Sequence, residues 1–182
     1  NLKKLNSLQT EEFEYKSQVW GIFPDKYMPA DKLLKLKVGA QIMTVKNGDD
    51  YVNGSIGIVK KLERDKIFVK IKNRIIKIEP VEWERFDYKK IKEKVYRPHV
   101  IGKFRQYPLK LAWASTIHKC QGQTFDKVIV DLDEGTFAHG MTYVALSRVK
   151  TLEGLSLARP LTADDIKFDN RIYDYHNSIQ LF

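Results

Sequence analysis

The stretch Leu109–Arg148, LKLAWASTIHKCQGQTFDKVIVDLDEGTFAHGMTYVALSR, decides the fold that the sequence predicts. It opens with alternating apolar and polar residues and continues, after a polar turn, into the apolar run KVIVDL. A continuous β-branched run suits a central parallel strand that is covered on both faces. Strand, turn or short helix, strand and helix form the βαβ pattern of an open α/β sheet. We therefore expect residues 109–115 and 127–132 to be parallel strands of such a sheet.

The polar segment STIHKCQGQT, residues 115–124, follows the first of these strands. Ligands of open α/β sheets bind outside the carboxyl ends of the strands, and a helix start there favours an anion. The side chains suited to hold a phosphate are Ser115, Thr116, His118 and Lys119. A capped helix start that merely faces water is the alternative, with Gly122 as an ordinary helix stop. Composition alone leaves both interpretations open.

The segment MTYVALSRV predicts a helix with an arginine on its packed stripe. At helical spacing, one face carries Met141, Val144, Ala145 and Arg148. An arginine is rarely left buried without a partner, so Arg148 should meet an anion. A transferring phosphoryl group is one such anion, in an arginine-finger arrangement. A salt bridge to a carboxylate such as Asp131 is the alternative.

Other residues that often carry chemistry form no recognisable site. The run VIVDLDEG resembles a strand that ends in Mg²⁺-binding carboxylates, but no G-x-x-x-x-G-K-[ST] phosphate loop accompanies it. We therefore interpret Asp131, Asp133 and Glu134 as polar residues at a strand end. The histidines lack ligand spacing, which predicts no metal site built by this chain. Cys120 lies two residues from His118, so on a helix the two side chains would point to different sides.

The region before this stretch changes from a connector to strand-type patterns. Pro24 and Pro29 mark a connector, and we place a domain boundary near Asp31. Short alternating runs with tight turns then extend from residue 33 to 107, which indicates a small barrel of the SH3-like or OB kind. Its turns include Asn53-Gly54. The lysines of these strands belong either to a solvated face or to a nucleic-acid track.

The C-terminal segment predicts one more strand and a helix. Gly154 to Arg159 has the pattern of a last strand. Thr162 and Asp165 have the spacing of a capping box, with Asp in place of the usual Glu or Gln. Apolar residues follow at helical intervals, namely Phe168, Ile172, Tyr175 and Ile179. We expect this helix to close one face of the sheet.

Composition narrows the class of protein. The 182 residues include 32 basic and 23 acidic side chains, a net charge of +9 that favours a polyanion partner, although lysine-rich surfaces also serve solubility. A single cysteine excludes a disulfide framework and fits a reducing compartment such as a bacterial cytoplasm or a nucleus. No apolar run approaches the roughly 20 residues of a membrane span. The chain starts at Asn1 in mid-pattern, so we expect it to be part of a longer protein, and we expect the fragment itself to be monomeric.

Three blocks of the sequence resemble one family. LKLAWASTIHKCQGQT followed by MTYVALSRVKTLEGL resembles the fifth and sixth signature motifs of superfamily 1 DNA helicases of the PIF-type and RecD-like group. LKVGAQIMTVKN and YVNGSIGIV resemble the segment that enters the SH3-like insertion of that group. The resemblance implies a second RecA-like motor domain made of residues 1–32 and 108–182, which an SH3-like β-barrel at 33–107 interrupts. Cys120 stands where the fifth motif usually has serine.

The resemblance also implies an activity and its residues. The whole protein would be an ATP-dependent 5′ to 3′ DNA helicase, with its phosphate loop and Mg²⁺ carboxylates on a first motor domain, so this chain alone would be inactive. Single-stranded DNA would be contacted by Ser115, Thr116, His118 and Lys119, and by Asn53 of the insertion. The nucleotide would be faced by Gln121, Gly122 and Thr124, with Arg148 as the finger on the γ-phosphate. A nucleic-acid-binding module without motor function and a remnant that binds only partners are the alternatives.

Overall fold

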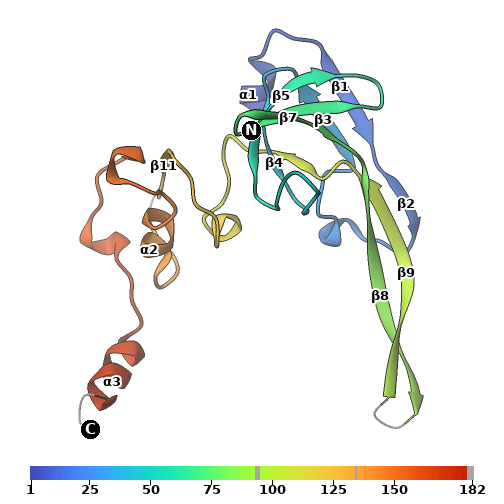
Figure 1. Ribbon diagram of the computed structural model, residues 1–182. Helices are drawn as coiled ribbons and strands as arrows, with labels where there is room; N and C mark the ends of the chain where they lie inside the picture. Colours follow the sequence, from blue (N-terminus) through green and yellow to red (C-terminus); the bar gives the residue numbers. More distant parts are fainter. Residues whose placement is uncertain (93–94, 134, 180–182) are drawn as a thin grey trace. The chain divides into compact units, whose positions relative to one another are not determined.

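The computed structural model describes residues 1–92, 95–133 and 135–179 (Figure 1). The chain divides into two compact units, Asn1–Ala114 and Ser115–Phe182, each with its own core. The chain contains both strands and short helices, and strands β3 to β10 follow one another without a helix between them. Among the described residues, no helix is long and apolar enough to cross a membrane.

The first unit is built around a five-stranded antiparallel sheet. The strands are β4 (Gln41–Thr44), β5 (Ile56–Leu62), β6 (Ile67–Ile71), β7 (Arg74–Ile78) and β10 (Leu109–Leu111), in the order β10-β4-β5-β6-β7. The strands expected between residues 41 and 78 are confirmed, because alternating apolar residues and tight turns determine both their extent and their pairing. Their buried side chains include Ile42, Val59, Ile67, Val69 and Ile78.

The N-terminal residues complete the core of this sheet. Helix α1 (Leu2–Asn6) buries Leu5 in it, and β1 (Glu12–Lys16) pairs with β3 (Leu33–Lys37). The side-chain amide of Asn1 exchanges two hydrogen bonds with the backbone of Ala114, at 2.8 and 2.9 Å. These two hydrogen bonds join the first and last residues of the first unit.

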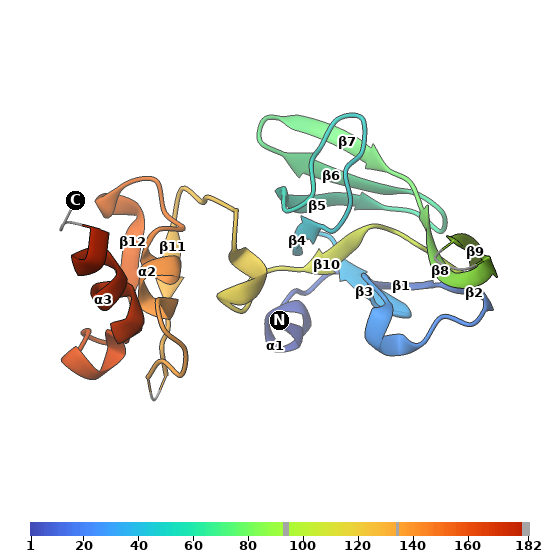
Figure 2. The same ribbon diagram turned by 90° about the horizontal axis from the view of Figure 1, so that it is seen from below.

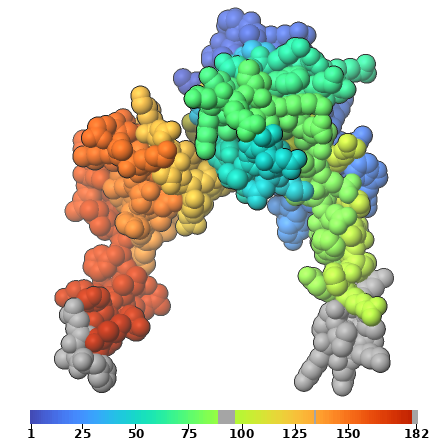
Figure 3. All heavy atoms as spheres, viewed as in Figure 1, coloured from blue at the N-terminus to red at the C-terminus, as the bar shows by residue number. Residues whose placement is uncertain are grey.

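A three-stranded sheet with a long hairpin completes the first unit. Its strands are β2 (Gln18–Gly21), β8 (Val81–Lys92) and β9 (Val95–Gln106), in the order β2-β9-β8, with the 3₁₀ turn η1 (Asp25–Tyr27) after β2. At the base of the hairpin, Phe104 is buried between Phe23 and Trp83, with both ring centroids 5.6 Å away. Strands β8 and β9 extend as an arm from the rest of this unit in the space-filling view (Figure 3).

The observed units do not coincide with the predicted boundaries at residues 32 and 107. Residues 1–32 lie in the first unit because β1 and β2 pair with β3 and β9. The predicted parallel strand at 109–115 is wrong, since β10 pairs antiparallel with β4, with Leu109 opposite Thr44. The alternation in LKLAW is the pattern of a strand with one covered face, not of a strand buried on both. Assignment of the flanking segments to a RecA-like domain stays a prediction.

The second unit contains a small parallel βαβ unit. Strand β11 (Val128–Val130) pairs in parallel with β12 (Leu155–Leu157), so strands form within the runs expected at 127–132 and 154–159. The expected coverage of the first run on both faces is wrong among the described residues, because Ile129 is 74% exposed. The helix between them, α2 (Met141–Leu146), lies beside β11 (Figure 2). Its Ala145 belongs to one apolar cluster with Val130 and Leu132. The remaining elements are η2 (His118–Cys120), η3 (Leu152–Gly154), η4 (Ala163–Asp165) and α3 (Asn170–Ile179).

The C-terminal helix differs from its prediction in two respects. The capping box of Thr162 and Asp165 is confirmed, but it starts only the short turn η4, because the backbone is extended again at Ile166. The residues expected to cover the sheet, Phe168, Ile172, Tyr175 and Ile179, are each at least 53% exposed, so that expectation is wrong within the described chain. An amphipathic pattern predicts an apolar face but not the surface that covers it.

Candidate functional site

Arg148 lies two residues after the end of α2 at Leu146, and not on the helix as predicted. It is held in place by neutral acceptors. Its Nε donates to the carbonyl of Val144 at 2.9 Å, Nη1 to the carbonyl of Gln123 at 3.2 Å, and Nη2 to Oγ of Ser147 at 2.8 Å. A guanidinium has five N–H donors, so two remain without a partner among the described residues. The half-buried side chain is therefore fixed in orientation while part of its donor capacity is free.

The alternative of a salt bridge from Arg148 to Asp131 is not observed. Oδ1 of Asp131 accepts from its own loop instead, from the backbone N–H of Asp133 at 3.0 Å. Within residues 1–92, 95–133 and 135–179, no carboxylate pairs with Arg148. Glu134, which the sequence placed at the strand end, lies outside the described residues. The Arg148 charge is thus uncompensated in this part of the chain and suited to an external anion.

The polar segment 115–124 contains the short 3₁₀ turn η2, which agrees with the polar turn or short helix that the sequence predicts. Ser115, Thr116, His118 and Lys119 are all exposed. The Lys119 N–H donates to the Thr116 carbonyl at 3.1 Å and to its hydroxyl at 3.4 Å, so Thr116 also acts as a local cap. Cys120 is half-buried. Four of the side chains predicted to contact DNA thus lie on one accessible segment, residues 115–119.

The second half of this segment passes beside Arg148. Gly122 has φ of +75°, a backbone conformation that favours glycine. A Cβ at this position would meet nothing within 4 Å, so the glycine is not required by a close contact. Gln121 and Thr124 are exposed. Beyond Gly122 the chain presents the Gln123 carbonyl to Arg148.

Gln123 is a contributor to the site that the sequence did not indicate. Its carbonyl accepts from Arg148, and its side-chain Oε1 is buried without a hydrogen-bond partner among the described residues. Spacing could not have indicated it, because every residue offers a backbone carbonyl. Asn53, by contrast, lies in the first unit, where its N–H donates to Oδ1 of Asn47 at 2.7 Å. It therefore belongs to a different compact unit from the other predicted site residues.

An aromatic pair lies beside the polar turn. His118 and Phe137 stack with ring centroids 5.9 Å apart and an interplanar angle of 26°. Phe137 is 76% exposed although it is a large apolar side chain. Phe137 was not predicted from the sequence, because the pattern of its loop marks no single residue as exposed. The pair joins a predicted DNA-contact residue to an accessible aromatic surface.

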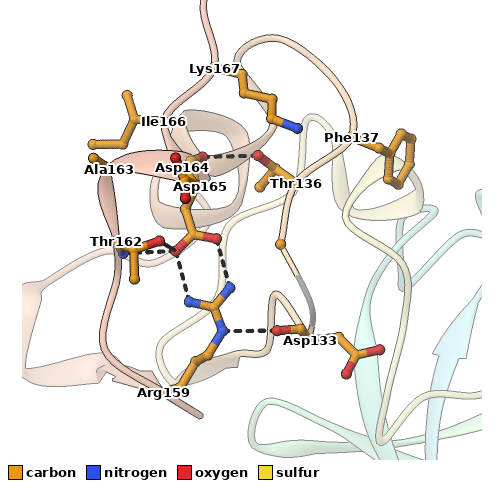
Figure 4. Close-up of a pocket in the computed structure, with 11 residues that line it drawn as sticks. Asp133, Thr136, Phe137, Arg159, Thr162, Ala163, Asp164, Asp165, Ile166 and Lys167 are labelled. Carbon is orange, nitrogen blue, oxygen red and sulfur yellow. Dashed lines mark hydrogen bonds and ion pairs between the residues drawn. The ribbon is translucent and has the colours of Figure 1, made fainter.

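A buried ion pair organises the loops of the second unit. Asp165 is 1% exposed, and Arg159 donates to both of its carboxylate oxygens at 2.7 Å (Figure 4). The bonds from Arg159 and Thr162 hold the pKa of the Asp165 carboxyl well below its usual range. The Asp165 carbonyl also accepts from the hydroxyls of Thr136 and Thr142. Asp165, Arg159, Thr162 and Thr136 border an open pocket of about 920 Å³.

A metal site was not expected on this chain. Within the described ranges, no three His, Cys, Asp or Glu side chains gather closely enough to hold an ion. The Mg²⁺ carboxylates that the family resemblance implies are expected on a first motor domain outside this chain.

The comparisons with known proteins point to one family. Residues 25–62 match the model for the 2B domain of DNA helicase Pif1. The ATP-dependent DNA helicase PIF1 of Danio rerio is 36% identical over 163 residues, which cover 87% of this chain and 23% of that protein. The ATP-dependent DNA helicase Pif1 of Campylobacter jejuni is 30% identical over 100% of this chain and 46% of its own length. The chain thus spans less than half of either relative.

One solved structure extends the similarity to three dimensions. The Pif1 helicase from Bacteroides, crystallised in complex with ADP-AlF3 and ssDNA, has a TM-score of 0.79 and 38% sequence identity to this chain. The match covers 98% of this chain and 42% of that structure. Both compact units therefore have counterparts in a solved protein.

Proposed function

Because this chain belongs to the PIF1-type helicases and corresponds to a C-terminal portion of such a protein, we propose that it supplies one half of an ATP-dependent DNA helicase motor. The missing length of the relatives leaves room for a first motor domain, which would carry the phosphate loop and the Mg²⁺ carboxylates. In this proposal the segments flanking the first unit's barrel are RecA-like and the barrel itself is SH3-like. The chain alone would not hydrolyse ATP.

Arg148 is the proposed arginine finger of this motor. The observation that carries the proposal is its fixed guanidinium, which has two unused N–H donors and no paired carboxylate among the described residues. ATP would supply the phosphoryl group for transfer to water. Arg148 would neutralise the charge that develops on this group, with Gln121, Gly122 and Thr124 beside the nucleotide. The Bacteroides relative was crystallised with ADP-AlF3, which supports a nucleotide site in this family.

The exposed turn of residues 115–119 is the proposed contact with single-stranded DNA. Ser115, Thr116 and His118 offer hydroxyl and ring N–H groups, and Lys119 adds a positive charge. A net charge of +9 favours such a polyanion. The same Bacteroides structure contains ssDNA, which supports this assignment. Asn53 is proposed as a further contact from the barrel.

The two proposed contacts belong to one continuous segment. DNA-facing residues 115–119 lead through Gly122 to Gln123, whose carbonyl holds Arg148. A change at the nucleotide could therefore reach the DNA-facing turn through a short stretch of backbone. This coupling would let ATP binding and hydrolysis alternate the grip on the strand, with 5′ to 3′ movement as in the expectation from sequence.

Substitution of Arg148 tests the motor role in the protein that contains this chain. Arg148→Ala should lower DNA-stimulated ATP hydrolysis by about a thousandfold or more, because an arginine finger contributes that much to the rate. Arg148→Lys should stay strongly impaired, since lysine lacks the planar fork. Arg171→Ala is the matched control, because Arg171 is exposed and forms an ion pair with nearby Asp169. Near-normal hydrolysis by Arg148→Ala would rule out the finger.

A further inference from the structure

We propose that Phe137, stacked with His118, is a platform on which a base of single-stranded DNA lies, next to the phosphate contacts of residues 115–119. The inference rests on the proposed function and adds a residue and a mode of recognition to it. The phosphate contacts hold the backbone of the strand, whereas Phe137 would contact the base.

The surface of Phe137 is suited to a flat aromatic ligand. The ring is 76% exposed, and one neighbour, the His118 ring, lies at 5.9 Å and nearly parallel to it. Proteins that bind single strands without sequence preference combine such aromatic surfaces with a positively charged track, because every base has a face that can stack. Lys119 and His118 provide the track beside the platform. The composition of this surface is therefore that of a single-strand contact.

The loop that carries Phe137 is held on both sides of the ring. Before it, the Thr136 hydroxyl donates to the Asp165 carbonyl at 3.0 Å, and after it the Gly140 N–H donates to the Lys167 carbonyl at 2.8 Å. Arg159 in turn fixes Asp165. The ring itself projects away from this ion pair (Figure 4). The buried bonds thus preorganise an exposed aromatic side chain, which reduces the ordering needed on binding.

Oligonucleotides with and without bases separate the platform from the phosphate contacts. Binding of an oligothymidylate and of an abasic strand of equal length would be measured by fluorescence anisotropy on the protein that contains this chain. Wild type should bind the oligothymidylate more tightly. Phe137→Ala should weaken binding of the oligothymidylate at least about fivefold and leave the abasic strand unaffected, because only a base can stack. An oligouridylate arm should show the same loss, since stacking does not require deoxyribose.

Further variants test the chemistry of the contact. Phe137→Tyr keeps the aromatic face and should retain the preference for bases, whereas Phe137→Leu keeps apolar bulk and should lose it. Lys119→Ala should weaken binding to both strands alike. Phe168→Ala, a second exposed phenylalanine in the same unit, is the control and should change neither affinity. An unchanged thermal unfolding midpoint would verify that each variant folds.

The outcomes distinguish this inference from the proposed function. If wild type binds neither strand, the proposed DNA contact fails and the platform fails with it. If wild type binds but Phe137→Ala retains the full preference for bases, only the platform is overturned. An equal loss on both strands would also overturn it, because Phe137 would then position the phosphate contacts or pack against another protein surface.

Discussion

At the scale of single residues, two arginines of the second unit have opposite environments. Arg159 forms a bidentate pair with the buried Asp165 carboxylate, while Arg148, within the described part of the chain, bonds only neutral oxygens. A compensated guanidinium stabilises the loops that it joins, whereas an uncompensated one retains its charge for a ligand. We therefore assign Arg159 a structural role and Arg148 the proposed role in ATP hydrolysis.

Removing the charge of Asp165 should destabilise the second unit. Asp165→Asn leaves Arg159 without its carboxylate and disturbs the capping of η4, so the unfolding midpoint should fall by more than about 5 °C. Differential scanning calorimetry would measure this shift. Asp126→Asn is the matched control, because its pair with Lys150 is exposed, and the midpoint should stay within error. Equal midpoints for Asp165→Asn and wild type would contradict the organising role of the pair.

The same carboxylate predicts a pH dependence of stability. Because folding lowers the pKa of Asp165, its contribution is fully present above the unfolded pKa of about 4 and is lost as pH falls below that value. The difference in unfolding midpoint between wild type and Asp165→Asn should therefore be constant near neutral pH and shrink below about pH 4. A difference that grew on acidification would contradict this sign.

At the scale of elements, the long β8–β9 hairpin depends on its base. Phe104 is fully buried there between Phe23 and Trp83, and β2 pairs along β9 from Gln18 to Gly21. At this crossing a Cβ on Gly102 would overlap the Ile22 carbonyl oxygen, so glycine permits the close approach. The packing at the base therefore ties the hairpin to the rest of the first unit.

Phe104 should contribute far more to stability than an exposed aromatic residue of the same hairpin. Phe104→Ala should lower the free energy of unfolding by about 3–5 kcal/mol, since it removes a buried ring and leaves a cavity. Phe86→Ala, at a position that is 49% exposed, should cost less than about 1 kcal/mol. Urea denaturation would compare the two. Similar losses would mean that the base of the hairpin is not a packed core.

At the scale of the whole molecule, the chain matches only part of the length of the PIF1-type helicases to which it is similar. The chain covers 23% of the Danio rerio relative and 46% of the Campylobacter jejuni relative. In the proposed motor, each unit contributes residues that contact DNA or nucleotide, and the phosphate loop lies on a first motor domain outside this chain. In that motor, the net charge of +9 would favour contacts with the phosphate backbone of DNA, which do not depend on the DNA sequence.

Binding of single-stranded DNA by the whole protein should accordingly weaken with salt. The logarithm of the association constant should fall linearly with the logarithm of salt concentration, and Lys119→Ala should reduce the magnitude of the slope by about 0.7, the value for one phosphate contact on a single strand. A titration series in sodium chloride would measure both slopes. Parallel lines for the two proteins would remove Lys119 from the contact.

The local features of this chain were predictable from its sequence. Alternating apolar residues and glycine-containing turns determined the strands between 41 and 78. The run KVIVDL and the segment from residue 141 predicted a strand and a helix, but the expected partner of that strand was residues 109–115 and not β12. The spacing of Thr162 and Asp165 predicted the capping box. The resemblance to PIF-type helicases was confirmed, whereas the roles assigned to Thr116, Lys119 and the other site residues stay predictions. These patterns act within a few residues, so sequence records them directly.

Only the tertiary structure decided which distant segments meet. In the structure, β10 pairs with β4, and residues 1–32 belong to the first unit. The apolar face of α3 is exposed among the described residues. In the second unit it set Arg148 against the Gln123 carbonyl and stacked Phe137 on His118. Such contacts join residues far apart in the chain, often through backbone groups that every residue possesses. Sequence could indicate that Arg148 needs an anion, and the fold decided that no carboxylate of the described chain provides it.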